Sequence, residues 1–173
     1  MILQALTPDC VFDTIYEITP AFLCKRGIHG ALIDIDGTAA SHRAALPEKQ
    51  LHHYVASLQQ AGIRAAFLSN NHAARVKKFS EAIGIPFVSR AVKPLPFGFR
   101  KGAAVLRLPM KEIAVIGDQI FTDVIGGNCL GALTCQVRSI DRGEFWIGVR
   151  CRLEQAFIER GRRKMQEDEK NVH

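Results

Sequence analysis

The sequence has no hydrophobic run long enough to cross a membrane. Its longest stretch without a charged side chain is 14 residues, reached for example at residues 124–137, whereas a transmembrane helix needs about 20 apolar residues. The N-terminal segment also lacks the basic residues that open a signal peptide, and it reaches Pro8 and Asp9 early. We therefore expect no transmembrane segment and a cytoplasmic location.

Paired cysteines and basic segments rich in aromatic residues are also missing. The five cysteines form an odd set without a CxxC pair, so neither a disulfide framework nor a zinc site is expected. Aromatic residues make up 8% of the chain, and they do not alternate with bases as they do in modules that stack on nucleobases. Nucleic acid is therefore not expected as the main partner.

The composition is that of a globular chain with a core. Hydrophobic residues make up 47% and charged residues 23% of the 173 residues. This length predicts one domain over residues 1–173, with a motif core at about residues 30–138 and a charged C-terminal helix and tail at about residues 150–173. The net charge of +6 favours anionic partners, such as phosphorylated metabolites or anionic lipid surfaces, without choosing among them.

Apolar runs and helical spacings alternate along the chain. Short apolar runs predict strands at residues 31–33, 63–68 and 113–116, with weaker candidates at residues 86–88 and 132–137. Apolar residues three and four apart predict helices at residues 47–61, 72–83 (with Asn71 as the N-cap), 96–108 and 121–130. Strands separated by helices of this length predict an α/β fold, a mostly parallel sheet with helices on both faces.

The three strong apolar runs end in polar residues, namely Asp34, Ser69 and Asp118. In an open parallel sheet, ligands bind beyond the carboxyl ends of the strands. We therefore expect these three side chains to lie along one edge of the sheet, although they are far apart in the sequence.

Four groups of residues at these predicted strand ends carry chemistry. The first is Asp34-Ile35-Asp36-Gly37-Thr38, in which two neighbouring carboxylates favour a divalent cation or a shared proton. The second is Ser69-Asn70-Asn71, whose hydroxyl and amides precede a predicted helix and suit phosphate oxygens. Lys93 lies in a proline-containing segment, and Asp118 and Asp123 flank a predicted strand-to-helix turn suited to Mg²⁺.

Each of these residues alone has a structural alternative. Asp123 could cap a helix, Ser69 could be a turn residue, and Lys93 could be a solvated surface lysine. His42 and His72 are interpreted as surface or core-edge histidines, with His72 an outside candidate for substrate contact. The bases near the predicted site either form a solvated face or recruit anions; they are Arg75, Lys77, Lys78, Arg90, Arg100 and Lys101.

Taken together and in this order, the four groups resemble the motifs of the haloacid dehalogenase (HAD) superfamily of phosphohydrolases. The stretches at residues 18–20, 84–87, 90–94 and 116–128 are similar to the small YqeG-like branch and to mitochondrial phosphatidylglycerophosphate phosphatases. The resemblance implies a HAD-like, Rossmannoid fold and a phosphatase.

The resemblance also implies roles for the residues. Asp34 would be the nucleophile that forms an aspartyl-phosphate, and Asp36 would be the general acid and base. Ser69 and Lys93 would complete the catalytic set. Thr38, Asn70 and Asn71 would bind substrate. Mg²⁺ would be held by Asp34, the Asp36 carbonyl, Asp118 and Asp123.

The spacing of the motifs leaves no room for the cap domain that many HAD enzymes carry. Residues 34–69 already hold a loop, a helix and a strand, and Lys93 follows Ser69 by only 24 residues. An open site suits a phosphate on a large carrier, so the leading substrate is phosphatidylglycerophosphate, with the chain peripheral at a membrane. One alternative is a soluble phosphorylated metabolite in a site closed by a homo-oligomer. The other is a non-catalytic anion-binding or ribosome-associated protein.

Overall fold

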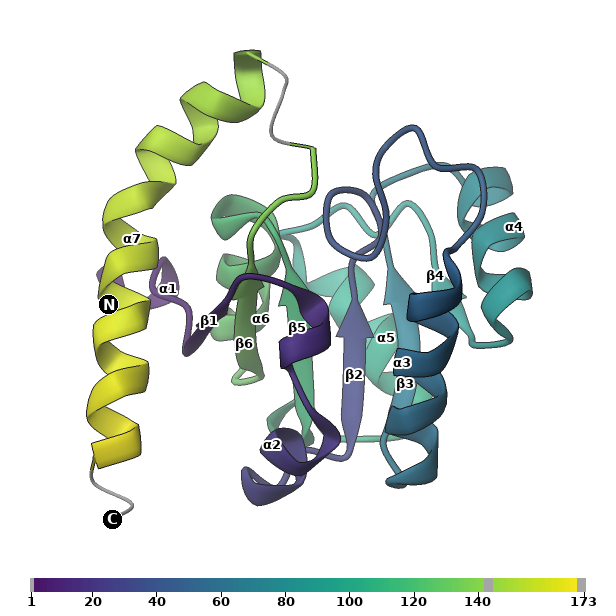
Figure 1. Ribbon diagram of the computed structural model, residues 1–173, viewed down its shortest axis with the longest axis horizontal. Helices are drawn as coiled ribbons and strands as arrows, with labels where there is room; N and C mark the ends of the chain where they lie inside the picture. Colours follow the sequence, from purple (N-terminus) through teal and green to yellow (C-terminus); the bar gives the residue numbers. More distant parts are fainter. Residues whose placement is uncertain (1, 142–144, 171–173) are drawn as a thin grey trace.

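The computed structural model describes residues 2–141 and 145–170, and its strands form one parallel sheet (Figure 1). The strand order is β1-β6-β5-β2-β3-β4. The strands are β1 Cys10–Phe12, β2 Gly30–Ile33, β3 Arg64–Leu68, β4 Phe87–Val88, β5 Ile113–Gly117 and β6 Leu133–Val137. The α-helices are α1 Ile2–Ala5, α2 Pro20–Lys25, α3 Lys49–Gln60, α4 Ala73–Ile83, α5 Pro96–Leu106, α6 Ile125–Cys129 and α7 Phe145–Lys170, and the short helical segments are η1 Ile15–Glu17, η2 Met110–Glu112 and η3 Ile120–Val124.

Alternate residues of the central strands pack into two hydrophobic cores, one on each face of the sheet. In β2, Ile33 belongs to one core and Leu32 to the other. The first core includes Leu51 of α3 and Val76 of α4, and the second includes Phe99 of α5. This arrangement confirms the predicted α/β fold with helices on both faces.

The connections beside the site are short. The chain passes from β2 to β3 through α3 and from β3 to β4 through α4. The described chain therefore contains no inserted cap domain, as predicted, and the carboxyl edge of the sheet is left to loops.

Some predicted elements differ from those in the structure, and some elements of the structure were not predicted, among them α1, α2 and β1. Strand β1 was not predicted, because it has three residues and depends on pairing with β6, more than 120 residues later. Helix α5 ends at Leu106 rather than residue 108, since Arg107 has a left-handed backbone with φ of 53°. The helix predicted at residues 121–130 is instead the π-helix η3 followed by the short α6.

The N-cap predicted for the helix at residues 72–83 is also wrong. His72 occupies the N-cap position of α4, and its side chain makes no capping hydrogen bond. The Asn71 side chain instead accepts a hydrogen bond from the His72 backbone N–H through Oδ1 and donates one to Asp36 through Nδ2. Asn71 is therefore committed to the predicted site rather than to the helix end.

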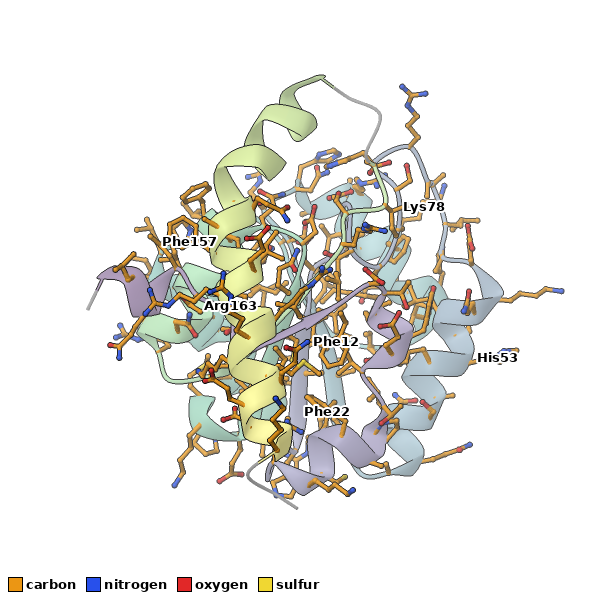
Figure 2. All side chains as sticks on the ribbon, turned by 60° about the vertical axis from the view of Figure 1, so that its left-hand side comes forward. Phe12, Phe22, His53, Lys78, Phe157 and Arg163 are labelled. Carbon is orange, nitrogen blue, oxygen red and sulfur yellow. The ribbon has the colours of Figure 1, made fainter. Side chains whose placement is uncertain are left out.

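Helix α7 covers the edge of the sheet at β1 (Figure 2). The two elements approach closely at Gly161, where a Cβ atom would lie 3.0 Å from Cγ2 of Val11 in β1. Glu154 of α7 is 1% exposed and accepts a hydrogen bond of 3.1 Å from the Ile120 backbone N–H. One side of α7, with Glu154 and Gly161, thus packs on the domain, while most of its other described residues are exposed; residues 171–173 of the predicted tail lie outside the described residues.

None of the helices in the described part of the chain combines the length and the apolar character needed to span a membrane.

Candidate active site

The carboxyl edge of the sheet brings Asp34, Ser69 and Asp118 together, as predicted. They directly follow β2, β3 and β5, which are neighbours in the sheet with β2 in the middle. The register places Ile33 beside both Phe67 and Ile116, and the Asp34 backbone N–H donates to the Ile116 carbonyl at 2.9 Å. Parallel pairing therefore converts three distant sequence positions into one site.

Three of the predicted metal ligands form a compact acidic cluster. Carboxylate oxygens of Asp34, Asp118 and Asp123 lie within 4.8 Å of one another, and all three residues are buried. Gly117 makes this possible, because a Cβ atom there would lie 2.2 Å from Asp123 Cγ. Three buried carboxylates repel one another unless cations offset them, and carboxylate oxygens are the donors that hard divalent cations prefer. The donor set therefore fits a divalent metal ion.

Lys93 supplies one cation to this cluster. Its ammonium donates to Asp34 Oδ1 at 2.5 Å and to Asp123 Oδ1 at 2.6 Å, and its side chain is 3% exposed. Asn70 holds the backbone of Lys93 on both sides: Oδ1 accepts from the Lys93 N–H at 2.7 Å, and Nδ2 donates to the Lys93 carbonyl at 3.2 Å. Lys93 thus lies in the site beside Asp34. The Asn70 side chain, which was predicted to bind substrate, holds the backbone of Lys93.

The pKa values of the nucleophile candidate and of the lysine are both shifted. Burial is the main reason why the pKa of Asp34 is raised to about 8; the Lys93 ammonium lowers it, and the carboxylates of Asp123 and Asp118 raise it. Burial alone would lower the pKa of Lys93, but the carboxylates of Asp123 and Asp34 outweigh it and raise that pKa. Lys93 therefore stays charged, whereas Asp34 holds a proton at neutral pH until another cation joins the cluster.

The carboxylate of Asp36 lies outside the acidic cluster and has partners of its own. Arg75 donates to Asp36 Oδ1 from Nε at 3.1 Å and from Nη2 at 2.7 Å, while Asn71 Nδ2 donates to Oδ2 at 3.2 Å. His42 Nδ1 is 3.8 Å from Oδ1. Of the two acids in the first motif, one faces the acidic cluster and the other faces a guanidinium.

Ser69 and Thr38 are both buried beside these groups. The Ser69 hydroxyl accepts a hydrogen bond of 3.0 Å from the Asn71 backbone N–H, and the Thr38 hydroxyl donates to Asp118 Oδ1 at 3.5 Å. Ser69 lines the cavity of the site, whereas Thr38 does not and contacts Asp118 of the acidic cluster.

A cavity of about 180 Å³ opens between these side chains. It is lined by Asp34, Asp36, His42, Ser69, Asn70, Asn71, Lys93, Gln119 and Thr122. Gln119 and Thr122 were not predicted; their place between Asp118 and Asp123 in the sequence is the one signal that could have indicated them. His42 was interpreted as a surface or core-edge residue, but it lies at the cavity because Asp141 binds its backbone N–H at 2.7 Å.

The fold and this site define the class of the protein: a Rossmann-like α/β domain with an acidic cluster at the carboxyl edge of its sheet. The sequence model of the haloacid dehalogenase-like hydrolases matches residues 48–131. The chain is also 35% identical over 147 residues to "Probable phosphatase YqeG" of Bacillus subtilis (strain 168), which covers 85% of this chain and 86% of that protein. The chain therefore belongs to the haloacid dehalogenase-like hydrolase family, and the predicted enzyme class, a HAD-type phosphatase, is confirmed.

Solved structures share the fold at low sequence identity. A 3-deoxy-D-manno-octulosonate 8-phosphate phosphatase described as putative, from Vibrio cholerae, is 16% identical with a TM-score of 0.52, over 84% of this chain and 91% of that one. The cobalt-bound deoxy-D-mannose-octulosonate 8-phosphate phosphatase of Haemophilus influenzae is 17% identical with a TM-score of 0.53, over 65% and 69% of the two chains. At these identities the similarity establishes the fold alone.

Proposed function

We propose that this protein is a Mg²⁺-dependent phosphomonoesterase that works through an aspartyl-phosphate on Asp34. The observation that carries the proposal is the position of Asp34, which lines the cavity, contacts the Lys93 ammonium and belongs to the acidic cluster. A carboxylate so placed can attack a phosphorus atom in the cavity, while neighbouring cations offset the charge that phosphoryl transfer brings together.

The reaction has two steps. First, an Asp34 oxygen bonds to phosphorus while the ester P–O bond breaks, and the leaving oxygen takes the electron pair and a proton from Asp36. Second, water gives a proton to Asp36 and bonds to phosphorus, and the bond between Asp34 and phosphorus breaks to release phosphate. Ser69 hydrogen-bonds a phosphoryl oxygen, and Lys93 stabilises negative charge on Asp34 and on the phosphoryl group.

Asp34, Asp118 and Asp123 would hold the divalent ion, with the backbone carbonyl of Asp36 as a further oxygen ligand. When bound, Mg²⁺ supplies positive charge that polarises the phosphoryl group and offsets the repulsion among the carboxylates. Asn71 and Thr38, which were predicted to bind substrate, serve in this proposal by holding Asp36 and Asp118.

Binding of Mg²⁺ is expected to depend on pH through Asp34. Because burial raises the pKa of Asp34 to about 8, the ion must displace a proton below that pH. The apparent affinity should rise about tenfold per pH unit from pH 6 to 8 and level off above pH 8. Calorimetry in buffers of different ionisation enthalpy should show release of about one proton per Mg²⁺ at pH 7. An affinity that stays flat over this range would contradict the role given to Asp34.

The rim of the cavity supports a substrate with an apolar part. Lys93, Gln119 and Thr122 line the cavity, and two of their close neighbours in the chain, Leu95 and Phe121, are 49% and 40% exposed. Exposed apolar side chains that follow cavity-lining residues so closely in the chain suit a phosphorylated amphiphile at an anionic lipid surface, which the net charge of +6 also favours. Phosphatidylglycerophosphate is therefore our leading substrate, and a peripheral position at a membrane is part of the proposal.

A comparison of esters tests this assignment. Phosphatidylglycerophosphate in vesicles, soluble glycerol and sugar phosphates, a nucleotide and a phosphopeptide are offered with and without Mg²⁺. The lipid ester should be hydrolysed fastest, and replacing both Leu95 and Phe121 by Ser should lower its rate about tenfold, because each loses part of the free energy of apolar burial. The rate on soluble glycerol phosphate should not change.

Val105→Ser is the control, because Val105 is 41% exposed but lies near the C-terminal end of α5, away from the cavity. Equal or faster turnover of soluble sugar phosphates, with no effect of the Ser pair, would contradict the lipid substrate. Light scattering would then show whether the same apolar rim closes the site by self-association, the alternative for a soluble metabolite.

A further inference from the structure

We propose that Arg75 is a positioning residue that holds Asp36 in place for proton transfer to the leaving group. Arg75 lies in the first turn of α4, 39 residues after Asp36, and carries no motif of its own. The inference rests on the proposed function, since it assumes that Asp36 is the general acid.

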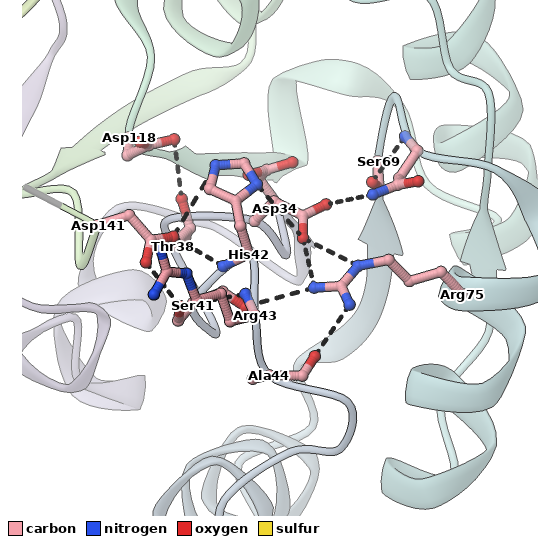
Figure 3. A network of polar contacts seen from close by, with 12 residues as sticks. Asp34, Thr38, Ser41, His42, Arg43, Ala44, Ser69, Arg75, Asp118 and Asp141 are labelled. Atoms are coloured by element: carbon pink, nitrogen blue, oxygen red, sulfur yellow. Dashed lines mark hydrogen bonds and ion pairs between the residues drawn. The ribbon is translucent and has the colours of Figure 1, made fainter. Parts of the chain in front are cut away.

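The hydrogen bonds of Arg75 are directed at Asp36 and at the loop that follows it (Figure 3). Nε and Nη2 both donate to Asp36 Oδ1, at 3.1 and 2.7 Å. Nη1 donates to the Ala44 carbonyl at 2.9 Å, and Nη2 also donates to the Ser41 carbonyl at 3.3 Å. The guanidinium has five N–H groups, and four contacts to Asp36 and this loop take most of them.

Arg75 does not line the cavity, so these contacts separate it from an arginine that binds phosphate. A phosphate-binding arginine directs its N–H groups into the pocket, whereas this guanidinium lies behind Asp36 with 19% of its side chain exposed. Arg75 can therefore reach the reaction only through the carboxylate that it holds.

Asp36 needs such support because its surroundings are unfavourable for a fixed carboxylate. It stands two residues from Asp34, a member of the acidic cluster, and neighbouring acids repel a carboxylate. A short acidic side chain also has several rotamers, and a misplaced general acid loses much of its effect. Arg75 counters both problems with one planar group, because it supplies positive charge and two bonds to a single oxygen.

The arrangement leaves Oδ2 as the oxygen for proton exchange. Oδ1 accepts both bonds from Arg75, whereas Oδ2 accepts one bond from the described residues, the 3.2 Å contact from Asn71. When the ester P–O bond breaks, the proton on Asp36 passes to the leaving oxygen and Asp36 is left as a carboxylate paired with Arg75. Asp36 regains a proton from the attacking water in the second step.

The dependence of the rate on the leaving group tests the proposal. An alkyl phosphate needs a proton on its leaving oxygen, whereas p-nitrophenyl phosphate has a leaving group that departs as the anion. For Arg75→Ala, we expect kcat/KM to fall about 100-fold for the alkyl ester and less than about threefold for the aryl ester. kcat/KM is the suitable quantity, since it does not include the later hydrolysis of the aspartyl-phosphate.

Lys78→Ala is the matched control, because Lys78 is an exposed base on the same helix (Figure 2), and it should change neither value. Arg75→Gln is measured alongside, as it keeps a hydrogen-bond donor if the Ala variant does not fold. In an Asp36→Asn background, adding Arg75→Gln should leave the ratio of alkyl to aryl kcat/KM unchanged, because the acid that Arg75 positions is already absent.

Equal losses for the two esters in Arg75→Gln, or a rise in KM alone, would overturn the proposal in favour of a structural or phosphate-binding role. No loss at all would overturn it as well. The wild-type protein could hydrolyse both esters and depend on Asp34, while the ratio of alkyl to aryl kcat/KM does not change in the Arg75 variants. In that case the inference fails and the proposed function stands. If the wild-type protein hydrolyses neither ester, the proposed function itself has failed.

Discussion

Asp34→Asn is expected to lower the turnover of every phosphate ester by more than about 10⁴-fold, since removal of a nucleophile costs factors of this order or larger. The substitution keeps the size and shape of the side chain but replaces the carboxylate by an amide, whose oxygen is a much weaker nucleophile toward phosphorus. The measurement is kcat/KM for an aryl phosphate with saturating Mg²⁺. Fresh protein is required, because slow deamidation of the introduced amide regenerates aspartate.

The fold should survive this substitution. Asp34 has its pKa raised to about 8 by burial and by neighbouring carboxylates, so at pH 7 without metal it is mostly a neutral acid, and an amide is a close substitute. The melting temperature of the metal-free variant should therefore stay near that of the wild type. Asp13→Asn is the control, since Asp13 is an exposed acid away from the site, and it should keep full activity.

Chemical trapping separates a nucleophile from a mere metal ligand. Wild-type protein quenched in acid during turnover of a labelled ester should retain phosphate in a bond that hydroxylamine cleaves, as expected for an acyl phosphate. The Asp34→Asn variant should retain none. Retention of label by the variant, or turnover close to that of the wild type, would mean that Asp34 is not the nucleophile.

The parts of the fold that the sequence predicts are those with local signals. The strands at β2, β3 and β5 are apolar runs that end abruptly at Asp34, Ser69 and Asp118, so their existence and their common edge follow from pattern and from the rule for parallel sheets. Strand β1 has no such signal. It is a strand because it pairs with β6. The two strands are too far apart in the sequence for a local pattern to indicate the pairing.

The residues of the site also divide into those with a signal in the sequence and those without one. Lys93 and the acids were predicted because their order matches a known set of motifs. The partners of Asp36 were not, because the contact with Arg75 joins a loop to a helix 39 residues later, and in the sequence Arg75 is one base among several. His42 lines the cavity, and its backbone N–H donates a hydrogen bond to Asp141, which is 99 residues away in the sequence. Side-chain partners across such separations depend on the packed fold rather than on any local pattern.

Lys93→Met is expected to lower both activity and stability, with different responses to Mg²⁺. Without the ammonium, the buried acidic cluster loses the cation that contacts Asp34 and Asp123. Removing one partner of a buried ion pair typically costs about 3–5 kcal/mol, so the metal-free variant should melt well below the wild type. kcat/KM should fall about 10²–10³-fold, because a charged donor to the transferring phosphoryl group is lost.

Mg²⁺ should restore the stability of this variant but not its activity. A divalent ion among Asp34, Asp118 and Asp123 offsets their repulsion whether or not Lys93 is present, so the rise in melting temperature on adding Mg²⁺ should be larger in Lys93→Met than in the wild type. The ammonium that faces the nucleophile is still missing, however, and the rate should stay low. Lys101→Met, at an exposed lysine of α5, is the control for loss of charge. Recovery of the rate by Mg²⁺ alone would show that Lys93 serves only to balance charge in the resting protein.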